Sequence, residues 1–157
     1  MELKLRSRLT EKDPETFRNI TADTGFFRPE ELKIAGGLAE EALKKPDEYL
    51  FYFAENPTET LGYACYAEIP CTVGSYEIYW LAVRKSAQGL GIGRLLTEAA
   101  EEDIAKRKGR KIYISTSGSS LYSGTRAFYN KLGYRKDAVL KDFYLPDEDQ
   151  VIYVKDI

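Results

Sequence analysis

The sequence contains no histidine, one methionine, one tryptophan and two cysteines among its 157 residues. The absence of histidine excludes every catalytic scheme in which an imidazole acts as base, acid or nucleophile partner, and it excludes most catalytic zinc sites. Any proton transfer must therefore use carboxylates, tyrosines, lysines, a thiol or water.

The cysteines do not suggest a metal site or a disulfide. Cys65 and Cys71 stand six residues apart and lack the C-x-x-C spacing of metal-binding and redox motifs. We therefore expect no metal cofactor and two free thiols, as is usual in a reducing compartment.

Long hydrophobic runs are also absent. None approaches the roughly 18 residues of a membrane span, and the N-terminal stretch MELKLRSRL alternates apolar and charged residues, unlike a signal peptide. We expect a cytoplasmic protein with no membrane partner. The 23 basic and 25 acidic residues give a net charge of −2, whereas nucleic-acid-binding proteins are usually basic, so no nucleic-acid partner is expected.

The composition is that of an ordinary globular protein, with 43% apolar and 31% charged residues. A chain of 157 residues can bury a core of its own. No linker, repeat or low-complexity tract interrupts it, so we predict a single domain over residues 1–157.

The most informative stretch runs from Tyr76 to Arg94. An apolar strand is predicted over 76–83, and a short charged connection leads into the loop QGLGIG at 88–93. A helix follows, because apolar residues recur at spacings of three and four, at positions 92, 95, 96, 99, 100 and 104. Glycines let backbone N–H groups face a ligand, and a helix N-terminus carries partial positive charge. The stretch therefore predicts a site for phosphate or pyrophosphate.

Several phosphate-binding patterns compete for this loop. The P-loop pattern GxxxxGK[ST] is absent from the chain. The dinucleotide pattern GxGxxG fails because its last position is occupied by Arg94. The pattern Gln-x-x-Gly-x-Gly does match, at Gln88, Gly91 and Gly93. A glycine-rich turn without a ligand is the remaining alternative.

A second stretch, RAFYNKLGY at 126–134, accompanies the loop. Together the two resemble the GNAT superfamily of N-acetyltransferases, specifically over about 76–134 and only in topology elsewhere. The resemblance implies acetyl-CoA as cofactor, held by backbone groups of the strand end and by Gln88 with the loop N–H groups. The implied cofactor-binding residues are Leu81, Ala82, Val83, Gln88, Gly89, Leu90, Gly91, Ile92, Gly93 and Arg94.

Two side chains are candidates for catalysis. The resemblance implies that Tyr129 protonates the coenzyme A sulfur, and its place on a helix face also predicts that its ring packs in the core. Glu77 lies in an apolar strand, where a carboxylate is costly to bury unless paired or protonated. In the histone-acetyltransferase branch a glutamate on this strand acts as general base. Alternatively, Glu77 lies at the solvated end of the strand, next to the turn at Gly74. One departure is Tyr122, where many members carry an asparagine that contacts the cofactor.

The order of predicted elements is strand, two helices, three strands, helix, strand, helix and two strands. This order indicates a mixed α/β (α+β) GNAT fold, with a central sheet of about seven strands flanked by about four helices. The first helix is expected to begin with Asp13 as N-cap. The second is expected to bury Leu32, Ile34, Leu38, Ala39, Ala42 and Leu43, and its Gly36-Gly37 pair indicates a kink or close packing.

The predicted reaction moves an acetyl group from acetyl-CoA to the primary amine of a small molecule or of a peptide or protein N-terminus. Four aromatic residues are expected to line the acceptor site, although the first two could equally fill the core: Phe26, Phe27, Tyr79 and Tyr144. The protein is expected to be a monomer or homodimer. A non-catalytic acyl-CoA-binding sensor or scaffold is the alternative. A toxin of this superfamily that modifies charged transfer RNA is disfavoured by the net charge.

Overall fold

The computed structural model describes residues 2–157, and their contacts divide the chain into two compact units. Unit 1 contains the residues up to Ala67 together with Trp80–Asp103, and unit 2 contains Glu68–Tyr79 and Ile104–Ile157. The single domain expected from chain length stays a prediction.

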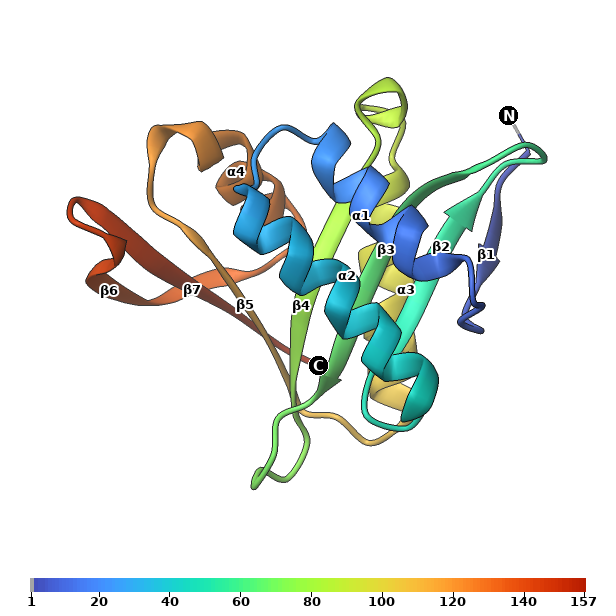
Figure 1. Ribbon diagram of the computed structural model, residues 1–157. Coiled ribbons are helices and arrows are strands. Elements are labelled where there is room, and N and C mark those ends of the chain that lie inside the picture. The colour runs from blue at the N-terminus through green and yellow to red at the C-terminus, as the bar shows by residue number, and fades with distance from the viewer. Residues whose placement is uncertain (1) are drawn as a thin grey trace. The chain divides into compact units, whose positions relative to one another are not determined.

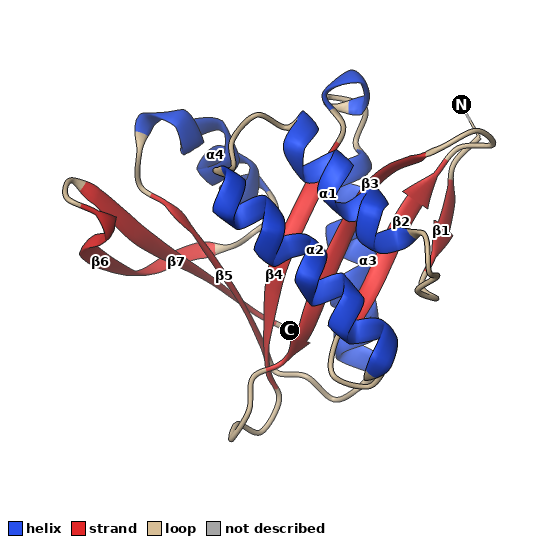
Figure 2. Ribbon diagram, viewed as in Figure 1, coloured by secondary structure: helices blue, strands red, loops and turns tan. Residues whose placement is uncertain are grey.

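Residues 2–157 form seven strands and four α-helices, as predicted (Figure 2). In chain order the elements are β1 (Lys4–Arg6), α1 (Asp13–Asp23), α2 (Pro29–Lys44), β2 (Leu50–Glu55), β3 (Thr60–Glu68), β4 (Ser75–Val83), the 3-10 helix η1 (Lys85–Ala87), α3 (Ile92–Lys106), β5 (Lys111–Ser117), the 3-10 helix η2 (Ser120–Tyr122), α4 (Ser123–Lys131), β6 (Arg135–Leu145) and β7 (Glu148–Asp156). The strands form one sheet in the order β1-β2-β3-β4-β5-β7-β6.

In unit 1, β1, β2 and β3 are antiparallel neighbours. Helices α1 and α2 lie on one face of these strands and α3 lies on the other (Figure 1). Side chains alternate between the two faces along a strand. Phe53 and Tyr63 therefore join the core cluster that contains Phe17 of α1, whereas Ala54 and Ala64 join the cluster that contains Leu96 of α3.

The start of α1 differs from the prediction. Lys12 is the N-cap residue and Asp13 is the first helical residue. The Asp13 carboxylate pairs with Arg6 at 2.8 Å and accepts a hydrogen bond from the Thr10 backbone at 2.6 Å. Asp13 therefore forms a buried ion pair that links α1 to β1. The sequence pattern around Asp13 could not distinguish this role from capping of the helix.

One residue of the buried stripe expected for α2 is instead exposed, while Ala39 and Ala42 lie in the core as expected. Ile34 is 61% exposed, whereas Ala35 and Gly36 are buried. A Cβ at Gly36 would clash with the stem and guanidinium of Arg18, while one at Gly37 would meet no atom within 4 Å. Close packing against Arg18 of α1 therefore explains Gly36, and α2 runs without interruption from Pro29 to Lys44.

In unit 2, β5 pairs in parallel with the first part of β4, from Ser75 opposite Lys111 to Glu77 opposite Tyr113. Strand β7 is antiparallel to both β5 and β6. Gly133, with φ of 91°, ends α4 by a turn in which the backbone N–H groups of Leu132 and Tyr134 both donate to the Tyr129 carbonyl at 3.1 Å. The segment at 126–134 is thus a helix, a glycine stop and a strand entry. No helix within residues 2–157 has the length and apolar character needed to span a membrane.

Candidate functional site

The loop between η1 and α3 is exposed but anchored at both ends. Residues 88–91 are exposed, while Ala87 before them and Ile92 after them are only 3% and 1% exposed and pack in the same core cluster. The loop backbone is therefore exposed to solvent, while the residues at its two ends are held in the core.

Two glycines give this loop its shape. Gly89 and Gly91 have φ of 78° and 83°, a region that side chains disfavour, and a Cβ built on either would meet no protein atom within 4 Å. The Gly91 carbonyl accepts a hydrogen bond from the Leu95 N–H at 3.0 Å, which makes it the first acceptor of α3. The N–H groups of Ile92, Gly93 and Arg94 therefore lie in the first turn, where no earlier helical carbonyl is available to them. This arrangement fits an anionic group such as the pyrophosphate of coenzyme A.

The end of β4 is held to the loop by Gln88, whose side-chain amide donates to the Val83 carbonyl at 3.0 Å. Arg84, the residue after Val83, is bonded to β3 in two ways. Its backbone N–H donates to the Leu61 carbonyl at 2.8 Å, and its guanidinium donates to the Thr60 carbonyl at 2.7 Å. These bonds fix the direction in which the chain leaves the strand.

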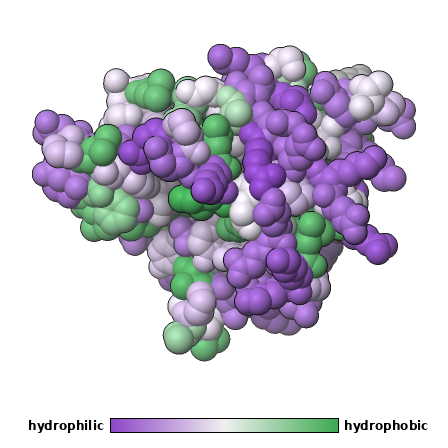
Figure 3. All heavy atoms as spheres, viewed as in Figure 1, coloured by the Kyte–Doolittle hydropathy of each residue, from purple (hydrophilic) through white to green (hydrophobic). Residues whose placement is uncertain are grey.

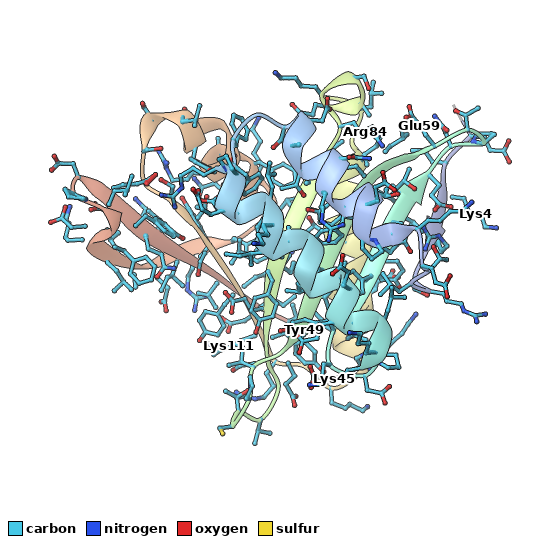
Figure 4. All side chains as sticks on the ribbon, in the orientation of Figure 1. Lys4, Lys45, Tyr49, Glu59, Arg84 and Lys111 are labelled. Carbon is cyan, nitrogen blue, oxygen red and sulfur yellow. The ribbon has the colours of Figure 1, made fainter. Side chains whose placement is uncertain are left out.

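Two arginine side chains near the loop pair with carboxylates of unit 1. Arg84 lies 3.5 Å from Glu59, and Figure 4 shows the two side chains near each other. Arg94 lies 3.4 Å from Glu98 one helical turn away. The sequence did not predict the role of Asp23, whose carboxylate accepts from the Lys85 backbone at 2.7 Å and ties η1 to the end of α1. The backbone N–H groups of the first turn of α3 are thus the candidate anion-binding groups of the loop.

Tyr129, the candidate acid, lies on α4 in unit 2 and is 6% exposed. Its ring contacts the rings of Phe128, Tyr134 and Tyr153, with centroids 5.5 to 6.1 Å apart. The predicted core packing is thus confirmed. Burial raises the pKa of the phenol above its ordinary value, so the hydroxyl keeps its proton at neutral pH. Among residues 2–157 no hydrogen bond involves this hydroxyl.

A positioning residue that the sequence did not reveal stands on the same helix. The guanidinium of Arg126 donates to the carbonyls of Ser117 and Ser119 at 2.8 and 2.7 Å. It thereby fixes the loop between β5 and α4, which includes Tyr122. No residue pattern in the sequence indicated this contact, because its acceptors are backbone atoms.

Glu77, the candidate base, lies on β4 within unit 2, in register with Tyr113 of β5. The side chain is half-buried, and desolvation raises the pKa of its carboxyl. In the described part of the chain it has no salt bridge or hydrogen-bonding partner. A half-buried, unpaired carboxylate is an unusual feature for a strand and a candidate proton acceptor.

The four aromatic candidates for the acceptor site fall in both units. Phe26 and Phe27 follow α1 in unit 1, and Phe27 packs against Trp80 with ring centroids 5.3 Å apart. Tyr79 and Tyr144 belong to unit 2, where Tyr144 lies edge-on to Phe143 at 5.0 Å. Phe26 and Tyr79 are partly exposed. Within residues 2–157 no group of three or more Cys, Asp or Glu could hold a metal ion.

Comparisons with known proteins agree on one family. A sequence profile described as the acetyltransferase (GNAT) family matches residues 9–134. Mycothiol acetyltransferase of Amycolatopsis mediterranei is 28% identical over 142 residues, which are 85% of this chain and 46% of that protein, so the chain spans about half the length of that curated relative.

Solved structures agree as well. A crystal structure described as a GNAT-family acetyltransferase from Desulfovibrio desulfuricans has 37% identity and a TM-score of 0.95, with 99% of both chains covered. An aminoglycoside 6′-N-acetyltransferase complexed with coenzyme A has a TM-score of 0.76 at 20% identity, with 99% of this chain and 97% of that chain covered, which is a likeness of fold alone.

Proposed function

Because this chain belongs to the GNAT acetyltransferase family, we propose that it transfers the acetyl group of acetyl-CoA to a primary amine. The family and the seven-stranded fold inferred from the sequence are confirmed. The acceptor is proposed to be the amine of a small molecule or the N-terminus of a peptide or protein. The cytoplasmic location stays a prediction.

The observation that carries the proposal is the backbone of the loop at 88–94. Gly89 and Gly91 take up positive φ, which favours glycine, and a Cβ on either would meet no protein atom within 4 Å. The space next to them is therefore available to a ligand, and the first turn of α3 offers its N–H groups there. In a structural turn, the same positions would tolerate asparagine or aspartate at small cost.

Acetyl-CoA supplies the activated acetyl thioester when it is bound. We propose that the backbone of Leu81, Ala82 and Val83 holds the pantetheine arm. The ladder between β4 and β5 comprises Ser75–Glu77 alone among the described residues, which supports this role for the later part of the strand. Gln88 keeps the end of the strand in place through the Val83 carbonyl.

Tyr129 is proposed to hold a proton on its hydroxyl and to donate it to the departing sulfur. Its raised pKa supports this role, because the group remains protonated at the pH of the reaction. Glu77 is proposed to accept a proton from the ammonium form of the acceptor, which makes the nitrogen nucleophilic. Its raised pKa brings it closer to the operating pH, as an efficient base requires.

The first experiment tests cofactor binding by thermal shift with coenzyme A. Wild-type protein should be stabilised by RT ln(1 + [L]/Kd), about 2.7 kcal/mol at a hundredfold excess over Kd. Gly91→Glu places a negative side chain in the anion site and should abolish the shift. Gly37→Glu, the same change at an exposed helix position with open space around it, should keep it. Equal shifts in the two variants would contradict the site.

The second experiment follows thiol release from acetyl-CoA with a panel of small amines and peptides. Turnover with any amine supports the enzyme. Saturable coenzyme A binding without turnover on any acceptor would instead support the alternative, a non-catalytic acyl-CoA-binding sensor or scaffold.

A further inference from the structure

The tip of the β3–β4 hairpin carries no charge and is largely apolar. It comprises residues 69–73, with the sequence IPCTV, between Glu68 at the end of β3 and Gly74 before β4. Val73 is 82% exposed, more than any other large apolar residue within residues 2–157. In Figure 3 this hairpin presents apolar surface at the lower edge of the view. Because single exposed apolar residues are common, the residues next to the tip decide what it can bind.

Those neighbours are basic. The chain leaving α3 has the sequence KRKGR at 106–110, and all four of its cationic side chains are exposed. This segment is bonded to the hairpin, because the Arg110 backbone N–H donates to the Gly74 carbonyl at 2.7 Å. The Arg110 guanidinium also donates, through Nε, to the Val73 carbonyl at 2.7 Å. Residues 69–73 and 106–110 therefore form one surface, the hairpin surface, which lies within unit 2.

Three of the four cations have no carboxylate partner. In the described part of the chain, Lys106, Lys108 and Arg110 form no salt bridge. The next cation along the chain, Lys111, does pair, with Asp156 at 2.6 Å. The three unpaired charges are therefore available to a partner outside the chain.

The end of α3 explains only part of this charge. A cation in the last helical turn, such as Lys106, interacts favourably with the helix dipole. Arg110 lies four residues beyond the end of the helix, outside the range of that effect. Lys108 has φ of 68°, in the left-handed region that favours glycine or asparagine at a helix end. The helix terminus alone does not account for the cluster, whereas an anionic partner does.

The hairpin surface is locally positive in a chain whose net charge is −2. It combines four cations with one bordering carboxylate, Glu68, which accepts from the Gly74 N–H at 3.3 Å. Charges act over about 8 Å at physiological ionic strength, so the nearby cations dominate what a partner meets at this surface.

An uncharged apolar tip next to exposed cations matches the chemistry of an anionic lipid bilayer. Apolar side chains enter the boundary between headgroups and acyl chains, and nearby Lys and Arg attract anionic headgroups. A nucleic acid fits less well, because residues 69–73 and 106–110 include no aromatic side chain on which a base could stack. A phosphate backbone would also leave the apolar tip in water.

We propose that the hairpin surface docks the protein on an anionic lipid bilayer, with the tip at 69–73 entering the headgroup region and the cations at 106–110 contacting the headgroups. Such a contact is peripheral and requires no spanning helix. The expectation of no membrane partner rested on the absence of a span and does not bear on it. The proposal goes beyond acetyl transfer and does not depend on it.

The first test is co-sedimentation of the full-length protein with lipid vesicles. Wild-type protein should bind vesicles of phosphatidylglycerol mixed with phosphatidylcholine, and it should not bind vesicles of phosphatidylcholine alone. Salt at about 1 M, which screens charges within about 3 Å, should release it. No binding to the anionic vesicles, or equal binding to both kinds, would overturn the proposal. Binding to a DNA duplex in place of the vesicles would also overturn it.

The second test removes single charges. Lys106→Gln and Lys108→Asn should each lower the affinity for the anionic vesicles about fivefold, the value of one cation near an anionic leaflet. Asparagine tolerates the left-handed backbone at 108, so the fold should be kept. Lys33→Gln, which removes the same charge at an exposed site on α2, should keep the affinity. Equal losses in Lys33→Gln and Lys106→Gln would show a response to net charge and would overturn the surface.

The third test measures entry of the tip into the lipid. Wild-type protein injected beneath a phosphatidylglycerol monolayer should raise its surface pressure. Val73→Ser, which removes apolar surface without changing the charge, should abolish the rise and lower vesicle affinity about tenfold. Ile34→Ser, the matched loss of an apolar side chain 61% exposed on α2, should behave as wild type. A pressure rise that is unchanged in Val73→Ser would overturn the insertion of the tip.

Discussion

The side-chain amide of Gln88 donates a hydrogen bond to the main-chain carbonyl of Val83 at 3.0 Å. Residue 88 begins the glycine loop and residue 83 ends β4. The bond therefore links the two parts of the proposed cofactor site, the strand edge and the anion-binding turn, across the short helix η1. A side chain expected to contact the cofactor thus has a bond within the protein that orients the loop.

Replacing this amide should weaken cofactor binding. Gln88→Leu keeps the size of the side chain and removes the hydrogen bond, whose net value is about 0.5–1.5 kcal/mol. The Kd for coenzyme A should rise by roughly two- to tenfold, as measured by isothermal titration calorimetry. Gln150→Leu, the same change in unit 2, should leave the Kd unchanged. An unaltered Kd in Gln88→Leu would show that the loop keeps its shape without the bond.

Glu77→Gln should stabilise the protein in a pH-dependent way. Burial raises the pKa of Glu77 above its ordinary value of 4.5, so the folded state binds the proton more tightly than the unfolded chain. Stability from this group is therefore present below pH 4.5 and is lost as pH rises through the raised pKa. Urea unfolding should find the variant more stable than wild type at pH 7, with the difference vanishing at low pH. Glu102→Gln, which removes a carboxylate at an exposed site on α3, is the matched control variant.

The same variant tests the role of Glu77 as a base. If Glu77 accepts the proton, kcat/KM of the wild type rises with pH through the raised pKa, and the variant loses this limb. A variant with the wild-type rate and profile would place Glu77 outside the mechanism.

Tyr129→Phe should lose turnover while keeping the fold. The ring retains its contacts with Phe128, Tyr134 and Tyr153, so the free energy of unfolding should change by no more than about 1 kcal/mol. General acid catalysis is typically worth about 10²–10⁴ in rate, so kcat should fall by at least a hundredfold. Tyr153→Phe removes a hydroxyl from the same ring cluster and should keep kcat. A Tyr129→Phe variant within threefold of wild type, or one that loses coenzyme A affinity instead, would contradict the acid role.

The adjacent glycines of α2 should respond differently to alanine. Gly37→Ala meets no neighbour and should raise the free energy of unfolding by about 0.5–1 kcal/mol, because glycine is costly inside a helix. Gly36→Ala forces Arg18 away from its present position and from its ion pair with Glu40, which should cancel most of that gain. Thermal and urea unfolding of the two variants give the comparison. A larger gain at 36 than at 37 would contradict the close packing of the helices.

The parts of the fold that follow from local periodicity were predictable. The apolar spacing of α3 predicted the buried residues Ile92, Leu96, Ala100 and Ile104, and the glycine at 133 predicted the end of α4. Ile34 was wrongly expected in the core. Its neighbour Ala35 is buried instead, and Gly36 lies against Arg18, a contact between residues distant in sequence that the local spacing does not reveal. Asp13 was wrongly assigned as a cap for the same reason, since its partner Arg6 lies on another element.

The candidate site was likewise predictable from the sequence only in part. The loop pattern gave the positions of the glycines, and the φ values of Gly89 and Gly91 supply the physical reason for them. The anchoring contacts could not be read from the pattern. Three side chains bond to main-chain atoms, those of Gln88, Arg126 and Asp23. Every residue has main-chain atoms, so the type of the partner residue does not reveal such a bond. The roles of Glu77 and Tyr129 stay predictions.

The two cysteines differ sharply in chemical accessibility. Cys65 is fully buried in β3, and burial raises the pKa of its thiol, whereas Cys71 is exposed on the β3–β4 hairpin. Because the thiolate is the reactive form, a maleimide dye should modify folded protein once per chain, at Cys71. Thiol-detecting assays of coenzyme A release will accordingly carry a constant background of one equivalent per chain. The native sequence therefore already provides a single attachment point for a fluorescent reporter, on the β3–β4 hairpin.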